Sequence, residues 1–362
     1  MIIHLSKEKS RLAIIQNIPK CFFRRIEEAN AFGGHLFPQW AVRVFRQTSM
    51  MKKFEAVYNK YKALEKQSER EKVVEAFFCT NQIEELCCRP HETLMITLED
   101  LPVNIQQEIK DLFEFLYQKA IHTVGFQNYV QDSVGENIER FLNKNKIRIC
   151  PFCGLEGLRV LRGQARPALD HWLCQESFPM AAVNFDNLFP IGNACNPSPV
   201  KGKKIVLLDQ DSEKRVRAYY PTTEHGGIDL KFKYLKEPQN IGERDKNWEL
   251  DLSPKRSEDE EVFKSWKSTM NIDVRYHDFF YTDIFPLWEE EYVGYLEESE
   301  KRHADTVEEL KNNLKEWKAS WKISCCPGAI LYRSFLDYLL NEASDCLLYT
   351  SPSPRDVENL VC

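Results

Sequence analysis

The chain has 362 residues, of which 43% are hydrophobic and 29% are charged, and its formal net charge is −6. This length and composition fit a soluble globular protein of about two or three packed units. The negative net charge excludes a strongly basic surface, so a contact with nucleic acid must come from a local patch of cations.

Neither a signal peptide nor a membrane span is expected. The apolar run before Lys7 is too short for a secretory signal, and no run of about 18 apolar residues occurs. The 12 cysteines are spread along the chain, which favours reduced thiols and a metal site over disulfides. We therefore expect a cytoplasmic protein.

Residues 1–145 are predicted to form a helical N-terminal region. Two stretches, 50–64 and 103–121, carry apolar residues every three or four positions, which is typical of a helix with one buried face. The residues expected to point inward are Met50, Phe54, Val57, Tyr61, Leu64, Ile105, Ile109, Leu112, Phe113 and Leu116. A third helix is expected near 137–143.

The outer face of the first of these helices carries Lys52, Lys53, Lys60 and Lys62. These lysines form either an ordinary solvated face or a contact for nucleic acid.

The segment that follows the central module, 209–252, is predicted to be a short extension of strands and loops. Strands are expected at 215–220 and 230–234, on either side of a turn-rich stretch. Residues 253–345 are predicted to be a helical C-terminal region, which opens with a charged linker at 253–261.

Two helices are expected in the C-terminal region, at 307–321 and 330–340. The first has the 3-4 spacing of a helix seam, at Val307, Leu310, Leu314, Trp317 and Trp321. This seam packs either inside a bundle or against a partner. Residues 346–356 resemble the translation of a transposase adapter used in sequencing libraries, so we interpret 346–362 as a non-native tail.

The central module, 146–208, contains thiols with the spacing of a zinc site. Cys150 and Cys153 form a Cys-x-x-Cys pair, which lets two sulfurs reach one ion from a tight turn. Cys195 is a third candidate ligand, whereas Gly192 stands where a second Cys-x-x-Cys pair would need its first cysteine. The fourth ligand is left open between Cys174, a carboxylate, a histidine and water. The alternative is that these cysteines are buried thiols without a metal.

A second set of polar residues is interleaved with the thiols. Asp170 and His171 are adjacent, Asn187 follows sixteen residues after His171, and Asn196 directly follows Cys195. A basic Lys-Gly-Lys-Lys run then supplies Lys201, Lys203 and Lys204. Oxygen donors of this kind suit a hard divalent ion such as Mg²⁺.

On these residues the stretch 150–204 resembles the HNH endonuclease family, in the branch written Cys-x-x-Cys-Gly, Asp-His-x-Leu-Pro-Lys, Tyr/Phe-Pro, Asn-Leu-x-Pro, Cys-Asn and Lys-Gly in this order. The match covers about 55 of the 362 residues. The resemblance implies an α+β protein, mainly helical, with a central ββα-metal (HNH) module flanked by helical regions. The chain departs from the branch pattern in three places. Cys174-Gln175 replaces Pro-Lys, Gly192 replaces a cysteine, and Lys201 comes late after Asn196.

The resemblance also implies a role for each residue. His171 would be the general base, with the ordinary imidazole pKa of about 6.5. Asp170 and Asn196 would hold a catalytic Mg²⁺ (or Mn²⁺) ion, which would stabilise charge on the phosphate. Asn187 would hold the loop that aims His171, and a structural zinc ion would pin the hairpin.

The implied function is hydrolysis of phosphodiester bonds in DNA. Lys201, Lys203 and Lys204 would contact backbone phosphates, with Arg159, Arg162 and Arg166 nearby in sequence. By analogy with HNH proteins that carry large helical flanks, the chain would be an anti-phage defence effector that works with a partner ATPase. The alternative is a zinc-stabilised module that binds nucleic acid or protein and whose catalytic set is idle.

Overall fold

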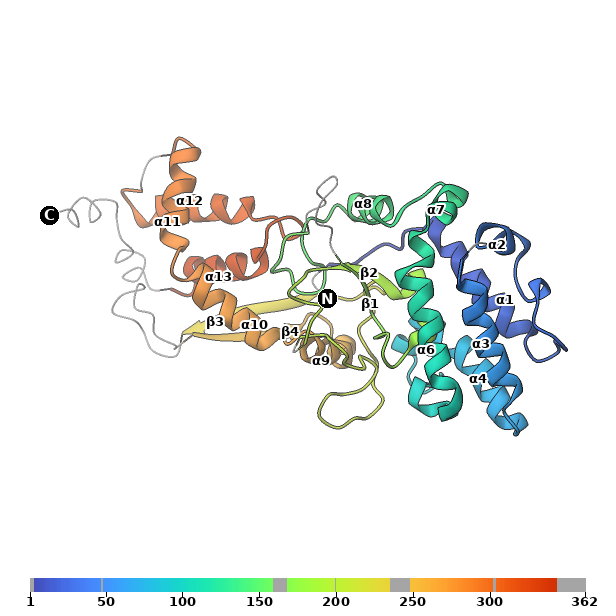
Figure 1. Ribbon diagram of the computed structural model, residues 1–362. Helices are drawn as coiled ribbons and strands as arrows, with labels where there is room; N and C mark the ends of the chain where they lie inside the picture. Colours follow the sequence, from blue (N-terminus) through green and yellow to red (C-terminus); the bar gives the residue numbers. More distant parts are fainter. Residues whose placement is uncertain are drawn as a thin grey trace.

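The computed structural model describes residues 3–46, 48–158, 168–198, 200–234, 248–301 and 304–343. Helices predominate, and two small antiparallel sheets accompany them, so the α+β, mainly helical class is confirmed. The body is elongated: the N-terminal helices lie at one end, the sheets in the middle and the last helices at the other end (Figure 1). The expected tail at 346–362 lies outside the described residues.

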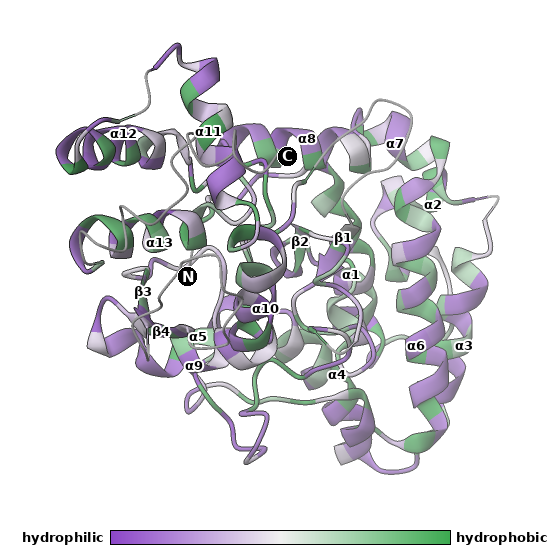
Figure 2. Cartoon of the chain, turned by 90° about the vertical axis from the view of Figure 1, so that its left-hand side faces the viewer, coloured by the Kyte–Doolittle hydropathy of each residue, from purple (hydrophilic) through white to green (hydrophobic). Residues whose placement is uncertain are grey.

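The N-terminal block consists of α1 (Asn17–Arg25), α2 (Gln39–Val44), α3 (Met50–Lys62), α4 (Gln67–Thr80), α5 (Ile83–Cys88), α6 (Val103–Gln118), α7 (Val124–Val130) and α8 (Val134–Asn145). The helices predicted from periodicity are confirmed as α3, α6 and α8. Every residue expected to point inward from α3 and α6 is buried, and both helices show a hydrophobic and a hydrophilic side (Figure 2).

A local sequence motif fixes where α8 begins. Ser133 and Glu136 form a capping box at the start of α8, which satisfies two backbone N–H groups.

On the lysine face of α3, Lys53 pairs with Asp111 at 2.9 Å and Lys60 pairs with Glu108 at 3.5 Å. Part of that face is therefore used to hold α6.

The first sheet is the hairpin of β1 (Ala168–His171) and β2 (Leu188–Ile191), in which Asp170 faces Phe189 and His171 faces Leu188. The second sheet pairs β3 (Ile228–Tyr234) with β4 (Trp248–Pro254). Alternate residues of β3 are buried, as expected for a strand with one face against a core.

The predicted strand at 215–220 is not formed, and β3 has β4 as its partner instead. The segment makes only one isolated bridge, between Leu208 and Arg215. Its backbone bonds to several different elements: Ala218 N–H donates to the carbonyl of Cys87 at 2.8 Å, and Arg217 N–H to the Glu261 carboxylate at 2.9 Å. Divided hydrogen bonding of this kind cannot build a ladder.

The predicted linker at 253–261 is also wrong, because structured elements occupy it. Strand β4 runs to Pro254, and a 3₁₀ turn (Ser257–Asp259) leads directly into α9 (Glu260–Thr269). The buried Asp259 carboxylate accepts hydrogen bonds from Gly226 N–H at 2.7 Å and from Arg256 Nε at 2.9 Å. Two of the charged residues that suggested a solvated linker, Arg256 and Asp259, therefore hold this turn together.

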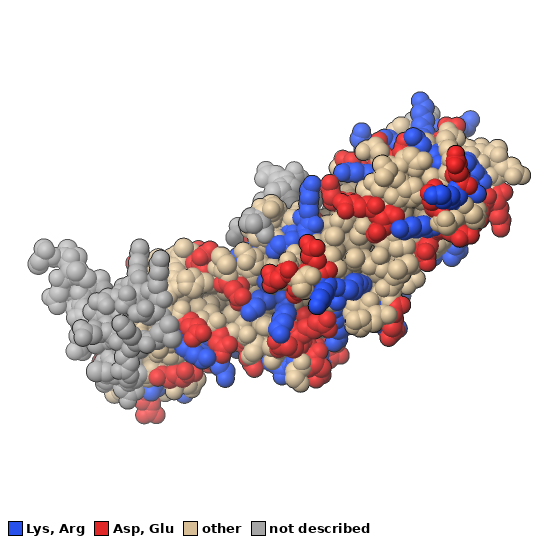
Figure 3. Space-filling model, turned by 90° about the horizontal axis from the view of Figure 1, so that it is seen from below, with Lys and Arg blue, Asp and Glu red and all other residues tan. Residues whose placement is uncertain are grey.

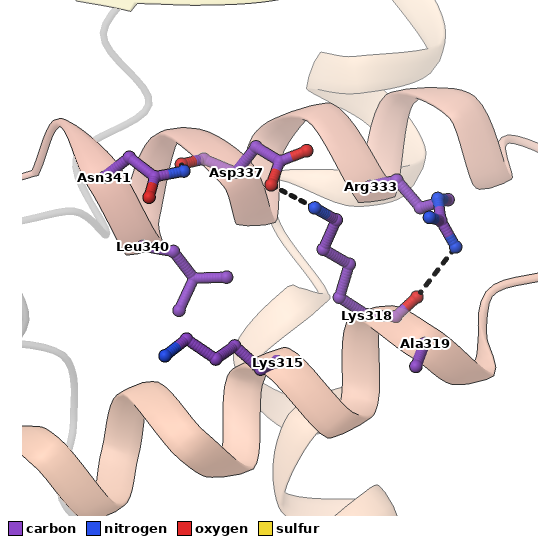
Figure 4. Close-up of a pocket in the computed structure, with 7 residues that line it drawn as sticks. All are labelled: Lys315, Lys318, Ala319, Arg333, Asp337, Leu340 and Asn341. Atoms are coloured by element: carbon purple, nitrogen blue, oxygen red, sulfur yellow. Dashed lines mark hydrogen bonds and ion pairs between the residues drawn. The ribbon is translucent and has the colours of Figure 1, made fainter.

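The C-terminal part continues with α10 (Ile272–Phe279), α11 (Trp288–Glu298), α12 (Val307–Ser320) and α13 (Ala329–Asn341). Both predicted helices are confirmed, and Leu314 and Trp317 of the seam are buried within the chain. A cavity of about 340 Å³ lies between α12 and α13, where Lys318 pairs with Asp337 and Arg333 donates to the Lys318 carbonyl (Figure 4). None of the residues predicted to form the site lines this cavity.

Among the residues described, no helix combines the length and the apolar character that crossing a bilayer requires.

Candidate functional site

Three of the cysteines predicted to bind zinc come together in the middle of the molecule. The sulfurs of Cys150 and Cys195 lie 3.5 Å apart, and those of Cys195 and Cys153 lie 3.2 Å apart. All three residues are buried, and their sulfurs lie within 4.8 Å of one another. Thiols gathered this closely from two distant segments could hold a metal ion.

The turn that presents the first two thiols is held on both sides. Within the turn, Gly154 N–H donates to the Cys150 carbonyl at 2.9 Å, and Gly154 takes the left-handed conformation with φ of 73°. From outside it, Trp266 of α9 donates to the Phe152 carbonyl at 2.7 Å, and the Tyr276 hydroxyl of α10 donates to the Cys153 carbonyl at 3.0 Å. The two thiols are thus fixed by helices more than a hundred residues later.

Arg275 of α10 supplies a positive charge to this cluster, and no sequence motif marks it. Its Nη1 donates to the Cys195 sulfur at 3.2 Å. Hydrogen bonds from the neighbouring thiols, together with Arg275, hold the pKa of Cys153 well below its usual value. Burial raises the pKa of Cys150. The cluster therefore favours at least one thiolate, with a guanidinium beside it.

The described residues offer no fourth side-chain ligand. The Cys174 sulfur donates to the Lys203 carbonyl at 3.3 Å and does not belong to the cluster. A Cβ at Gly192 would lie 3.3 Å from the Cβ of Cys150, so this position faces the cluster, but it would overlap the carboxylate of Glu156. Glu156 instead accepts from the N–H groups of Asn193 and Ala194 at 2.8 and 3.0 Å.

His171 is buried under the loop between β1 and β2. Its Nε2 lies 3.0 Å from the carbonyl of Ala182, and its ring packs edge-on against Tyr117 of α6, with 4.3 Å between ring centroids. Burial lowers the pKa of His171 to about 4, an effect that Asp170 and the Ala182 carbonyl oppose and that Lys201 adds to. The expectation of an ordinary imidazole pKa was wrong, because the fold desolvates the ring.

Asn187 holds the loop that covers His171. Its Oδ1 accepts from Leu173 N–H at 2.7 Å, and its Nδ2 donates to the carbonyls of Leu173 and Ala181 at 3.1 and 3.4 Å. The side chain is fully buried. These are the contacts that the predicted loop-holding role of Asn187 requires, since Ala181 immediately precedes the residue whose carbonyl contacts His171.

The three lysines predicted to form a phosphate-binding cluster are in three different environments. Lys201 is only 1% exposed, and its Nζ lies 2.8 Å from Oδ2 of Asp170. Lys204 is half-buried and donates to the carbonyls of Ser268 and Thr269 at the end of α9. The Lys203 side chain is 77% exposed. Lys201 was predicted to contact backbone phosphates, but in the fold it is buried against the carboxylate of Asp170.

Asn196 lies on a turn rather than on a helix. In the ββα arrangement implied by the resemblance, a helix would follow the hairpin, but the described residues from 192 to 204 form turns and bends. Within this turn, Lys201 N–H donates to the Cys195 carbonyl at 3.2 Å, and Gly202 N–H donates to the Asn196 carbonyl at 2.9 Å. The hairpin is thus present without that helix.

The arrangement around Asp170 does not fit a Mg²⁺ ion. The Lys201 ammonium already pairs with the carboxylate at 2.8 Å, and Asp170 belongs to no cluster of three or more carboxylate, histidine or thiol ligands among the described residues. A hard divalent ion needs net negative oxygen ligands. The pairing with Lys201 therefore opposes Mg²⁺ binding at Asp170 in this arrangement, and the magnesium site of Asp170 and Asn196 stays a prediction.

Charges are intermixed on one face of the molecule. Basic and acidic side chains alternate over the face shown in Figure 3, without a continuous field of one sign. This pattern agrees with the net charge of −6. Arg159, Arg162 and Arg166, which were expected to extend the basic patch, lie outside the described residues.

Sequence reasoning missed three residues of the site: Tyr117 on α6, Glu156 after the thiol turn, and Arg275 on α10. Each belongs to a segment whose own pattern carries no signal of metal or phosphate chemistry. No family model, curated protein or solved structure matches the chain.

Proposed function

We propose that the chain is an HNH-type endonuclease that hydrolyses phosphodiester bonds in DNA. The observation that carries the proposal is the hydrogen bond between His171 and the Ala182 carbonyl, on a hairpin whose connecting loop is held by Asn187. A carbonyl oxygen only accepts hydrogen bonds, so Nε2 of His171 must carry the proton. In a neutral imidazole this leaves Nδ1 as the basic nitrogen.

In the proposed reaction, Nδ1 of His171 takes a proton from the attacking water. The water oxygen forms a bond to phosphorus while the bond from phosphorus to the 3′ oxygen breaks. The leaving 3′ oxygen takes a proton from solvent water, which gives 3′-hydroxyl and 5′-phosphate ends. A His171 pKa of about 4 keeps the imidazole neutral at pH 7. Asn187 acts on this step only by positioning the loop. No step of this reaction passes through Mg²⁺, because the Lys201 ammonium pairs with the Asp170 carboxylate.

The metal of the thiol cluster is proposed to be zinc, in a structural role. Thiolate ligands favour zinc over harder ions, and three thiolates leave the zinc complex with one negative charge, which Arg275 can compensate. The ion would tie the turn at Cys150 and Cys153 to the end of the hairpin at Cys195.

The experiment is cleavage of supercoiled plasmid, linear duplex, single-stranded DNA and RNA, with Mg²⁺ or Mn²⁺ and with chelator as control. The variant is His171→Ala, and the matched control is His91→Ala, which removes an exposed histidine of the N-terminal block. We expect cleavage of DNA by the wild type and the His91 variant, and none by the His171 variant. Cleavage that survives His171→Ala would contradict the proposal.

The second candidate is a zinc-stabilised binding module with an idle catalytic set. The burial of His171 and the pairing of Asp170 with Lys201 favour it, because both remove the reacting groups from solvent. Its expected result in the same experiment is DNA binding, measured by gel shift, without cleavage by zinc-loaded protein.

A further inference from the structure

Lys201 is a buried lysine, which is rare in proteins unless the ammonium is paired. Its side chain is 1% exposed, whereas that of its partner Asp170 is 14% exposed. The carboxylate therefore reaches solvent on one side, while the ammonium behind it does not. Among the described residues, Asp170 is the only acidic group that forms an ion pair with Lys201.

The position of Lys201 is fixed by the turn that carries it. The turn starts at Cys195 in the thiol cluster, and Lys201 N–H donates back to the Cys195 carbonyl at 3.2 Å. Gly202 follows with a left-handed φ of 47°, and a Cβ there would lie 3.1 Å from the backbone nitrogen of Ser198. A residue with a Cβ would be strained at this position, so the tight turn that carries Lys201 requires glycine here.

The charges around Asp170 decide which cation it can hold. Beside it in the chain, the His171 ring of β1 packs against the Tyr117 ring of α6, with 4.3 Å between ring centroids. The Asp170 carboxylate and the Lys201 ammonium lie 2.8 Å apart, so their charges largely cancel. A divalent ion at Asp170 would meet this ammonium at close range, and the repulsion would oppose its binding.

We propose that the Lys201 ammonium competes with divalent cations for the Asp170 carboxylate. The carboxylate then binds such an ion only when the ammonium moves away or is removed by substitution. The importance of that ion for DNA cleavage rests on the proposed function, whereas the competition itself concerns only cation binding. In the arrangement described, Asp170 is a latent cation site.

The experiment measures Mn²⁺ binding to the zinc-loaded full chain by electron paramagnetic resonance, because Mn²⁺ prefers oxygen ligands and ignores a thiolate site. The variant Lys201→Met keeps the length of the side chain and removes its charge. The matched control Lys203→Met makes the same change at the exposed neighbour. We expect Lys201→Met to bind Mn²⁺ about tenfold more tightly, or better, than the wild type and the control.

Two further variants keep the test conclusive if Lys201→Met does not fold. Lys201→Gln keeps a hydrogen-bond donor near Asp170, and the double variant Lys201→Met/Asp170→Asn restores neutrality of the buried pair. Zinc content and circular dichroism show which variants fold. The double variant should lose the gained Mn²⁺ affinity. Equal Mn²⁺ affinity in folded Lys201→Gln, Lys201→Met and Lys203→Met would overturn the proposal.

The plasmid assay separates this inference from the proposed function. Tighter Mn²⁺ binding by Lys201→Met without cleavage of any substrate would support the competition and contradict the nuclease. Cleavage by the wild type together with unchanged Mn²⁺ affinity in Lys201→Met would support the nuclease and contradict the competition.

Discussion

The imidazole of His171 is 6% exposed, and the Ala182 carbonyl and the Tyr117 ring enclose it. The same residue in an extended peptide would titrate near neutral pH. Here burial outweighs the favourable Asp170 charge, so the neutral form is kept. Lys201 is also buried, but as part of an ion pair, because its Nζ lies 2.8 Å from the carboxylate of Asp170.

The lowered pKa of His171 predicts a loss of stability in acid. Between the unfolded pKa of about 6.5 and the folded value of about 4, only the unfolded chain binds the proton, so the free energy of unfolding falls as the pH falls. From pH 7.5 to pH 5 the contribution of His171 should fall by about 2 kcal/mol. Urea unfolding at both pH values checks this prediction.

The comparison variant for this titration is His171→Gln, which cannot protonate. Its free energy of unfolding should differ less between pH 7.5 and pH 5 than that of the wild type. An equal difference in the two proteins would show that other groups cause the acid sensitivity.

At the scale of the element, the hairpin of β1 and β2 depends on one side chain from its own connecting loop. Asn187 satisfies the N–H and carbonyl of Leu173 and the carbonyl of Ala181, all of which are buried. Elsewhere, periodicity located α3, α6, α12 and α13 correctly, because each helix has a buried face of its own. The prediction of a strand at 215–220 was wrong, because the backbone partners of this segment lie on several other elements.

Removing the Asn187 side chain should loosen the loop over His171. Asn187→Ala leaves buried backbone groups without partners, and we expect it to lower the free energy of unfolding by about 2–4 kcal/mol. Asn193→Ala is the matched control, because that residue is exposed and its bond to Glu156 comes from its backbone N–H, which the substitution keeps. Chemical denaturation gives the free energies, and amide exchange at Leu173 reports the loop. A change of the same size in both variants would contradict the assigned contacts.

At the scale of the whole molecule, the segment 150–204 is held from both ends of the chain. Tyr117 contacts it from the N-terminal helices, while Trp266, Arg275 and Tyr276 contact it from α9 and α10. The candidate site lies between the two helical ends of the elongated body (Figure 1). A metal ion in the thiol cluster would therefore link parts of the chain that the backbone separates widely.

This arrangement predicts a strong effect of metal removal on the entire fold. Cys195→Ser should lose bound zinc and should lower the free energy of unfolding by about 3 kcal/mol or more, as should chelation of the wild type. The matched control is Cys174→Ser, another buried cysteine, whose sulfur lies outside the cluster. Metal analysis and thermal unfolding measure both effects. Loss of zinc from the Cys174 variant would show that the ligand set is different.

The sequence by itself determined the main helices, the three clustered thiols, and the Asp170, His171 and Asn187 set on one hairpin. These features depend on residues a few positions apart or on residue types that serve few other purposes. Only the tertiary structure decided that β3 pairs with β4, that Arg275 joins the thiols, and that Lys201 is buried against Asp170. The physical reason is that burial and ion pairing are set by segments that meet only in the folded chain, so no local pattern encodes them.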